Sequence, residues 1–215
     1  MKDISVFPTQ YGVASLILKE VLYRAIAYIR VLASTPDNLP LLIRECAGFC
    51  RACGAEKIYW SAEDATGEPD VTVVEMRGTA LVDKEKIASV FPVTEQTVSR
   101  WRQIYNERMF HVDNATTLEA RDEKELLSSV GACFIHKDGE LLGIGWLEDT
   151  ELRAIAAVIP GAGEQVAHTL MSLVEGSIVT LQVASTNQKA IRLYERLGFL
   201  QTRPLRKWYL VKDFD

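Results

Sequence analysis

The stretch TLQVASTNQKAIRLYERLGF, residues 180–199, decides the fold of this chain. The stretch begins as a strand, because apolar and polar residues alternate through residues 179–184. From Asn187 the apolar residues recur at helical spacing, which predicts an amphipathic helix. Gly198 ends that helix at a position where a positive φ is favourable. Asn187 and Tyr194 therefore share one helical face, two turns apart.

The same stretch carries the pattern N-x-x-A-x-x-L-Y-E-x-x-G-F, which resembles the last strand–helix unit of the GNAT acyl-CoA N-acyltransferases. The resemblance implies that the Asn187 side chain contacts the pantetheine or pyrophosphate arm of coenzyme A. It also implies that the Tyr194 hydroxyl protonates the departing thiolate. An ordinary amphipathic helix with a buried tyrosine is the alternative. Seven fixed positions in the correct order favour the family.

Composition sets the broad class of the protein. A chain of 215 residues suits one large domain or two small ones, and 48% hydrophobic with 25% charged residues is ordinary for a globular protein. A net charge of −5 argues against a nucleic-acid partner. Apolar runs are shorter than the ~20 residues of a membrane span, and the first ten residues do not resemble a signal peptide. We therefore expect a cytoplasmic protein with no membrane partner.

Three of the four cysteines lie close together in the sequence. Cys46, Cys50 and Cys53 have the spacing C-x3-C-x2-C, which also occurs at the iron–sulfur site of radical SAM enzymes. Residues 38–55, however, have the apolar periodicity of a helix, and free cysteines behave as small hydrophobic residues. The half that contains them is also too short for a large barrel. The sequence favours packed thiols and no metal.

The first half of the chain indicates strands around one helix. Residues 13–31 predict two strands, with a helix as the alternative, and residues 57–61 and 71–76 predict two more, the last followed by a turn at Arg77-Gly78. The tetrapeptide RAIA occurs at residues 24–27 and again at 153–156, which is either chance or an echo of a duplication. We expect residues 1–85 to form a smaller GNAT-like or accessory α/β unit without a cofactor loop.

The second half, residues 86–215, has the element order of the GNAT fold. The expected elements are a strand at 88–93, helices at 95–109 (with Thr94 as N-cap) and 118–130, a hairpin around residues 137–140, a strand at 151–158, a glycine turn at 161–163, a helix at 164–175, the opening strand and helix, and a strand at 206–211. The resemblance implies an α/β (α+β) fold with a mixed, mostly antiparallel central sheet flanked by helices.

A second candidate site is the glycine turn before the helix at residue 164. Free N–H groups at a helix N-terminus attract phosphate. The resemblance implies that the pyrophosphate of coenzyme A binds at this turn, whose cofactor-binding residues would be Gly161, Ala162, Gly163, Glu164 and Gln165. The turn departs from the family pattern in its length, in a proline before the first glycine and in the carboxylate of Glu164.

The resemblance also implies the reaction, in which an amine attacks the acetyl thioester of acetyl-CoA. Backbone N–H groups of the strand that carries Ala156 and Val158 would stabilise the oxyanion, although the family usually has Arg or Gln where Val158 stands. Glu151 is our candidate base, with Asp149 and Glu148 as alternatives. The expected acceptor is a primary amine of a small molecule, and a homodimer is left open. The competing interpretation is a non-catalytic GNAT-fold module that binds coenzyme A or acts by interaction.

Overall fold

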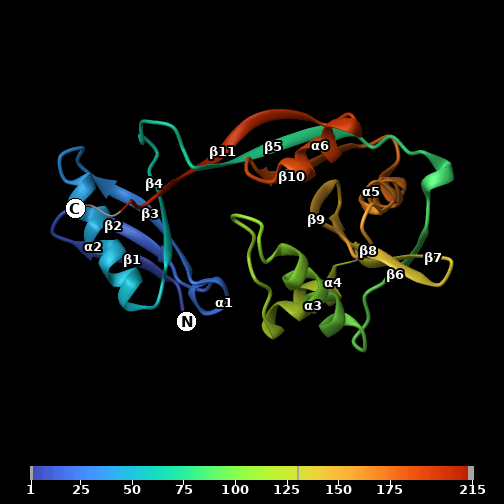
Figure 1. Ribbon diagram of the computed structural model, residues 1–215, viewed down its shortest axis with the longest axis horizontal. Helices are drawn as coiled ribbons and strands as arrows, with labels where there is room; N and C mark the ends of the chain where they lie inside the picture. The colour runs from blue at the N-terminus through green and yellow to red at the C-terminus, as the bar shows by residue number, and fades with distance from the viewer. Residues whose placement is uncertain (1, 130, 213–215) are drawn as a thin grey trace. The chain divides into compact units, whose positions relative to one another are not determined.

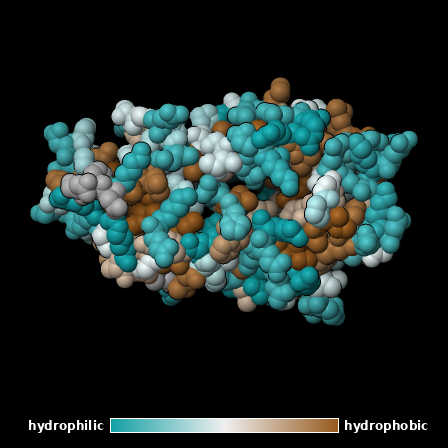
Figure 2. Space-filling view, viewed as in Figure 1, coloured by the Kyte–Doolittle hydropathy of each residue, from teal (hydrophilic) through white to brown (hydrophobic). Residues whose placement is uncertain are grey.

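The structure is a computed structural model that describes residues 2–129 and 131–212. The chain forms two compact units, one with the residues up to Thr72 and those from Arg206 onward, and the other spanning Val73–Leu205. The division falls before the expected boundary at residue 85, because the strand that precedes residue 80 packs with the second unit. The face shown in Figure 2 is mostly hydrophilic, with hydrophobic patches between the charged side chains.

The first unit is a mixed sheet with one long helix. Its elements are β1 (Ile4–Thr9), β2 (Gly12–Ile17), α1 (Val21–Arg24), β3 (Ile26–Ser34), α2 (Leu39–Ala52), β4 (Lys57–Ser61) and the end of β11 (Leu200–Leu210). The strand order is β1-β2-β3-β4-β11, and only the β3–β4 pair is parallel. The prediction of two strands within residues 13–31 is confirmed, whereas β1 was not predicted. Helix α2 buries Cys46 and Cys50 in the unit's apolar core.

The second unit contains the predicted GNAT order. Its elements are β5 (Val71–Thr79), the 3₁₀ helix η1 (Lys84–Lys86), β6 (Ser89–Pro92), α3 (Val98–Met109), η2 (Ala120–Asp122), α4 (Glu123–Ser128), β7 (Ala132–Lys137), β8 (Glu140–Glu148), β9 (Glu151–Ala157), α5 (Gly163–Met171), η3 (Ser172–Val174), β10 (Ile178–Ala184), α6 (Gln188–Arg196) and the start of β11. The strand order is β11-β5-β10-β9-β8-β7-β6. Helices α5 and α6 cover one face, and α3 and α4 cover the other (Figure 1). The α+β fold with a mixed, mostly antiparallel sheet flanked by helices is confirmed.

Some local predictions were wrong. The turn expected at Arg77-Gly78 is absent, since β5 continues to Thr79. Gly78 instead allows close packing, because a Cβ added there would lie 2.8 Å from the Phe199 ring. Helix α3 begins at Val98 rather than at residue 95. The helix expected at 118–130 is shortened to η2 and α4, and Val130 lies outside the described residues.

The two halves of the chain share one layout and exchange a strand. Each has three antiparallel strands, a crossover helix and a parallel strand: β1-β2-β3-α2-β4 and β7-β8-β9-α5-β10. The antiparallel neighbour of β4 is β11, and that of β10 is β5. Each unit is thus completed by a strand from the other half of the sequence. The RAIA echo is not equivalent in space, because residues 24–27 end α1 and start β3, whereas residues 153–156 lie within β9.

The two parallel strand pairs differ in how far their pairing extends. In the first unit, β3 and β4 pair along all five residues of β4, from Ile26↔Lys57 to Arg30↔Ser61. In the second unit, β9 and β10 pair only at Thr180↔Glu151 and Leu181↔Leu152. Beyond those residues the two strands run on without pairing to each other. Only the second unit has an opening in its sheet at this position.

Candidate functional site: an open strand pair beneath two helix N-termini

The opening between β9 and β10 leaves backbone groups of β9 without a strand partner. The Val158 N–H donates to the Leu142 carbonyl of β8 at 2.7 Å. Since N–H groups alternate in direction along a strand, the N–H groups of Ile155 and Ala157 face the opening instead. This corrects the expectation for Ala156 and Val158, whose N–H groups face β8. The odd-numbered residues of β9 are therefore the ones whose N–H groups face the opening.

The turn between β9 and α5 lies at the same end of the sheet. Gly161 has a φ of +87°, the left-handed conformation that glycine adopts without strain. The Ala162 N–H donates to the Ile159 carbonyl, so that predicted donor is already used. Gly163, Glu164 and Gln165 form the first turn of α5, where backbone N–H groups lack helical acceptors. Of the predicted phosphate-binding donors, the N–H groups of these three residues are still available.

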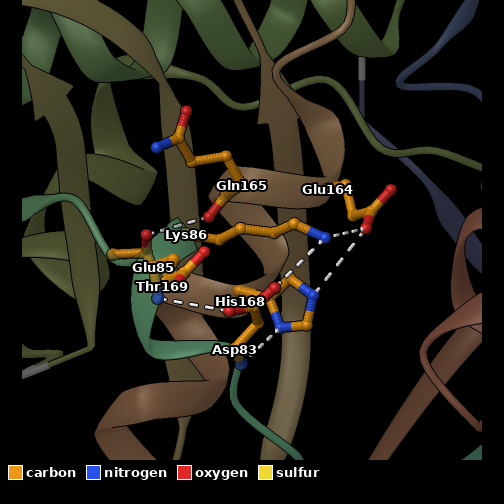
Figure 3. A network of polar contacts seen from close by, with 7 residues as sticks. All are labelled: Asp83, Glu85, Lys86, Glu164, Gln165, His168 and Thr169. Atoms are coloured by element: carbon orange, nitrogen blue, oxygen red, sulfur yellow. Dashed lines mark hydrogen bonds and ion pairs between the residues drawn. The ribbon is translucent and has the colours of Figure 1, made fainter.

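The Glu164 carboxylate is neutralised by a lysine that the sequence analysis did not consider. Lys86 Nζ lies 2.6 Å from Glu164 Oε1 and 3.4 Å from Asp83 Oδ2 (Figure 3). The hydrogen bond from Lys86 lowers the pKa of Glu164 below its usual range. The Thr169 hydroxyl on α5 accepts from the Ala88 N–H, which fixes this segment against the helix. The lysine therefore offsets the negative charge next to the amides of α5.

Asn187 begins α6 at the carboxyl end of β10. Its Oδ1 accepts from the Ala190 N–H at 3.2 Å, so the side chain caps the helix. The amide Nδ2 has no protein partner among residues 2–129 and 131–212. Since β9 and β10 are parallel, their carboxyl ends meet at one edge of the sheet. Asn187 and the glycine turn consequently lie at the same edge, as the resemblance implies.

Tyr194 is almost fully buried, and its hydroxyl has no hydrogen-bond partner among the described residues. The side chain is 7% exposed, and its ring lies 6.0 Å from the Phe199 ring. Every fully buried polar side-chain atom in the described chain has a partner, so the Tyr194 oxygen must touch accessible space. A Cβ added at Gly163 would lie 3.7 Å from Leu193, which places this part of α6 beside the start of α5. Burial raises the pKa of Tyr194 above its usual value.

The three candidate bases have different surroundings. Glu148 lies 2.7 Å from Arg153 in an ion pair, and Asp149 has a φ of 50° in the turn between β8 and β9. The ion pair gives the Glu148 carboxylate a structural role. Glu151 is exposed and pairs with Thr180 at the closed end of the opening. Ile155 is roughly 13 Å further along the strand, so Glu151 could act on an amine there only through water.

Two further contacts lie at this edge of the sheet and were missed from the sequence. Arg108 Nη2, in the last turn of α3, donates to the Val158 carbonyl at 2.9 Å. The Thr186 hydroxyl donates to Asp113 Oδ2 at 2.8 Å, so the segment after α3 is tied to the turn before α6. Neither contact has a signal in the sequence spacing, because the partners are 50 and 73 residues apart.

His168 is buried and makes a structural hydrogen bond. His168 Nδ1 accepts from the Asp83 N–H at 3.3 Å. Among residues 2–129 and 131–212, no group of three or more His, Cys, Asp or Glu side chains could hold a metal ion. Within the same residues, no helix is long and apolar enough to cross a membrane.

Comparisons with known proteins agree with this architecture. Residues 120–209 match the family model described as FR47-like protein. A search among curated proteins found no significant match. A GCN5-related N-acetyltransferase from Anabaena variabilis superposes with a TM-score of 0.60 at 11% identity, covering 93% of this chain and 59% of that one. A functionally unknown conserved protein from Staphylococcus epidermidis gives 0.57 at 12%, covering 97% and 93%. A GNAT-family acetyltransferase from Colwellia psychrerythraea gives 0.52 at 13%, covering 96% and 84%.

The fold and the open strand pair are those of the GNAT architecture. Residues 120–209 are similar to the FR47-like family, and the structural neighbours include GNAT acetyltransferases. The first half repeats the GNAT sheet layout with a closed strand pair. At these identities the solved structures show the fold alone, so the chemistry must be argued from this chain's residues.

Proposed function

We propose that this protein is an acetyl-CoA-dependent N-acetyltransferase that acetylates a primary amine of a small molecule by direct attack. The opening between β9 and β10 supports this most strongly. It offers the unpaired N–H groups of Ile155 and Ala157 at one wall. The helix beside it carries the Tyr194 hydroxyl, which has no protein partner in the described chain. A closed strand pair, as in the first unit, would use these N–H groups for strand pairing.

The proposed reaction assigns one role to each group. The amine nitrogen attacks the thioester carbonyl, and the N–H groups of Ile155 and Ala157 stabilise the resulting oxyanion. Collapse of the intermediate forms the amide and breaks the carbon–sulfur bond. Tyr194 gives its proton to the departing thiolate and regains one from solvent. The proton that the amine loses passes through water to Glu151, the proposed base at the closed end of the opening.

The acetyl-CoA arm would follow the edge of the sheet where the two helices begin. The amides of Gly163, Glu164 and Gln165 would bind the pyrophosphate. Lys86 makes this feasible, because it neutralises the only carboxylate within those three residues. The Nδ2 group of Asn187 would donate to the pantetheine arm.

A non-catalytic module that binds coenzyme A is the second candidate. The turn between β9 and α5 is short and has Val158 where the family usually has Arg or Gln. A weaker phosphate-binding site would fit a protein that has kept the fold and no longer catalyses acetyl transfer.

The two candidates are separated by an assay of free thiol. The full-length protein is incubated with acetyl-CoA and a panel of primary amines, and coenzyme A release is followed by a thiol reagent. We expect release that depends on both the amine and the protein, with mass spectrometry showing the acetylated amine. Binding of acetyl-CoA without amine-dependent release across the panel would favour the module instead.

A further inference from the structure

Arg108 is an exposed cation held at the β9–α5 turn. It lies in the last turn of α3, and its Nη2 atom donates to the Val158 carbonyl at 2.9 Å. That bond is its only hydrogen bond, and it has no ion pair, within residues 2–129 and 131–212. A guanidinium has five N–H donors, so most of them remain available to a ligand.

The anchor point of Arg108 is the position where the turn departs from the family pattern. Val158 stands where Arg or Gln is usual, and the amides of α5 begin five residues later. The valine side chain packs with the apolar cluster on the α3 face and cannot bind an anion. Arg108 therefore brings a positive charge from another element to the same place in the fold.

Arg108 has no carboxylate partner in the described chain, and it is one of several cations near the start of α5, where Arg196 also lowers the pKa of Glu164. Lys86 is already shared between Glu164 and Asp83. The segment beyond α3 is fixed by the bond between Asp113 and Thr186, which holds the end of α3 near both turns. An anchored arginine loses less conformational freedom on binding than a mobile one.

We propose that Arg108 binds a phosphate group of coenzyme A at the glycine turn. This inference rests on the proposed function. Its chemistry is a charge-assisted hydrogen bond from the guanidinium to phosphate oxygen, with the Val158 carbonyl orienting the fork. Arg108 then acts in cofactor binding and not in the acetyl-transfer step.

The test is titration calorimetry on the full-length protein with three ligands: coenzyme A, dephospho-coenzyme A and pantetheine. The variant is Arg108→Gln, and the matched control is Arg100→Gln, which removes one exposed charge from the same helix. We expect Arg108→Gln to weaken coenzyme A binding by about tenfold, as for loss of a charge-assisted hydrogen bond, and Arg100→Gln to change it less than twofold. Pantetheine, which has no phosphate, should bind both variants as it binds the wild type.

Dephospho-coenzyme A identifies the phosphate. A loss of affinity that persists with this ligand assigns Arg108 to the pyrophosphate, and a loss that disappears assigns it to the 3′-phosphate. An Arg108→Lys variant should keep part of the affinity, because charge is retained while the fork is lost. Thermal unfolding of each variant checks that the fold is intact.

The outcomes that overturn the proposal are distinct from failure of the proposed function. Equal coenzyme A affinity in the wild type and Arg108→Gln overturns the role of Arg108 alone. An equal loss for pantetheine does the same, since the effect would then not involve phosphate. If the wild type itself binds no coenzyme A, the proposed function fails, and this inference fails with it.

Discussion

At the scale of single residues, Tyr194 is the proposed proton donor to the departing thiolate. Its ring is packed in the core, yet its hydroxyl bonds to no protein group in the described chain and touches accessible space. Desolvation raises its pKa and so favours the protonated hydroxyl, which is the form that can donate a proton. The hydroxyl of a buried tyrosine usually has a hydrogen-bond partner in the protein, and that of Tyr194 has none in the described chain.

The variant Tyr194→Phe should lower kcat by about 10²–10⁴-fold, the usual contribution of a general acid. The midpoint of thermal unfolding should stay the same, because the hydroxyl donates no hydrogen bond to the protein. Acetyl-CoA affinity should also be nearly unchanged. Steady-state kinetics with an accepted amine provide the measurement. Turnover within twofold of wild type would show that Tyr194 is only a packing residue.

The cysteines should react in a defined order with Ellman's reagent at pH 8. Burial raises the pKa of Cys46 and Cys133 to about 11 and that of Cys50 to about 12, whereas Cys53 is partly exposed. Thiolate is the reactive form, so we expect one fast thiol in the folded protein and four after unfolding. Two or more fast thiols would contradict the packing of α2 and β7.

The same thiols predict how stability depends on pH. Their pKa values are raised above the ordinary value of 9.0 in the folded state, so the folded protein holds these protons more tightly than the unfolded chain. Their contribution is complete below pH 9 and is lost as the pH rises toward 11. Urea unfolding at pH 8 and pH 10.5 should show a lower free energy at the higher pH. Replacing Cys46 with Ala should reduce that difference.

At the scale of elements, close approach decides where glycine is required. Gly78 lies in a strand against Phe199, which is 1% exposed, and a Cβ there would lie 2.8 Å from the ring and 3.0 Å from its Cα. Gly48 lies on the exposed face of α2, with nothing within 4 Å of an added Cβ. Packing therefore requires glycine at position 78 and does not require it at position 48.

This contrast gives a matched pair of substitutions. Gly78→Ala should destabilise the protein by about 1–3 kcal/mol, the usual cost of overpacking a core. Gly48→Ala should stabilise it by roughly 0.5–1 kcal/mol, because alanine is the better helix former. Denaturant unfolding measures both. A stable Gly78→Ala variant would mean that β5 is not packed against Phe199.

The sequence predicted elements better than it predicted their long-range partners. Periodicity and turn residues located α2, β4, the β7–β8 hairpin and α6, because these signals are local. The same local reasoning placed a turn at Gly78, since a glycine needed for close approach looks like a turn glycine. It also chose the wrong N–H groups on β9, because the direction of a backbone donor depends on the register with β8. Lys86 and Arg108 were missed since their partners are distant in the chain.

At the scale of the whole molecule, the strand exchange makes the two halves of the sequence interdependent. β10 has seven paired residues with β5, from Ile178↔Thr79 to Ala184↔Val73. β5 lies before residue 80, in the half that we expected to be accessory. A cut at the expected boundary of residue 85 would therefore remove a central strand from the sheet that contains the candidate site.

A truncated chain that starts at residue 86 should fail to unfold cooperatively, because β10 and β11 would lose the strand between them. A chain that starts at residue 70 retains β5 and should show a cooperative transition. Circular dichroism during heating compares the two. Equal cooperative transitions in both chains would contradict the strand exchange.

Hydrogen–deuterium exchange of the full-length protein, with and without saturating acetyl-CoA, tests the central claim most directly. The account predicts slower exchange in residues 154–165 and 187–194, where the β9 edge, the start of α5 and the Asn187–Tyr194 helix face the ligand. It predicts no change in β3 and β4, whose pairing is closed. Protection in β3 and β4, or unchanged exchange in residues 154–165, would contradict the assignment of the site to the open strand pair.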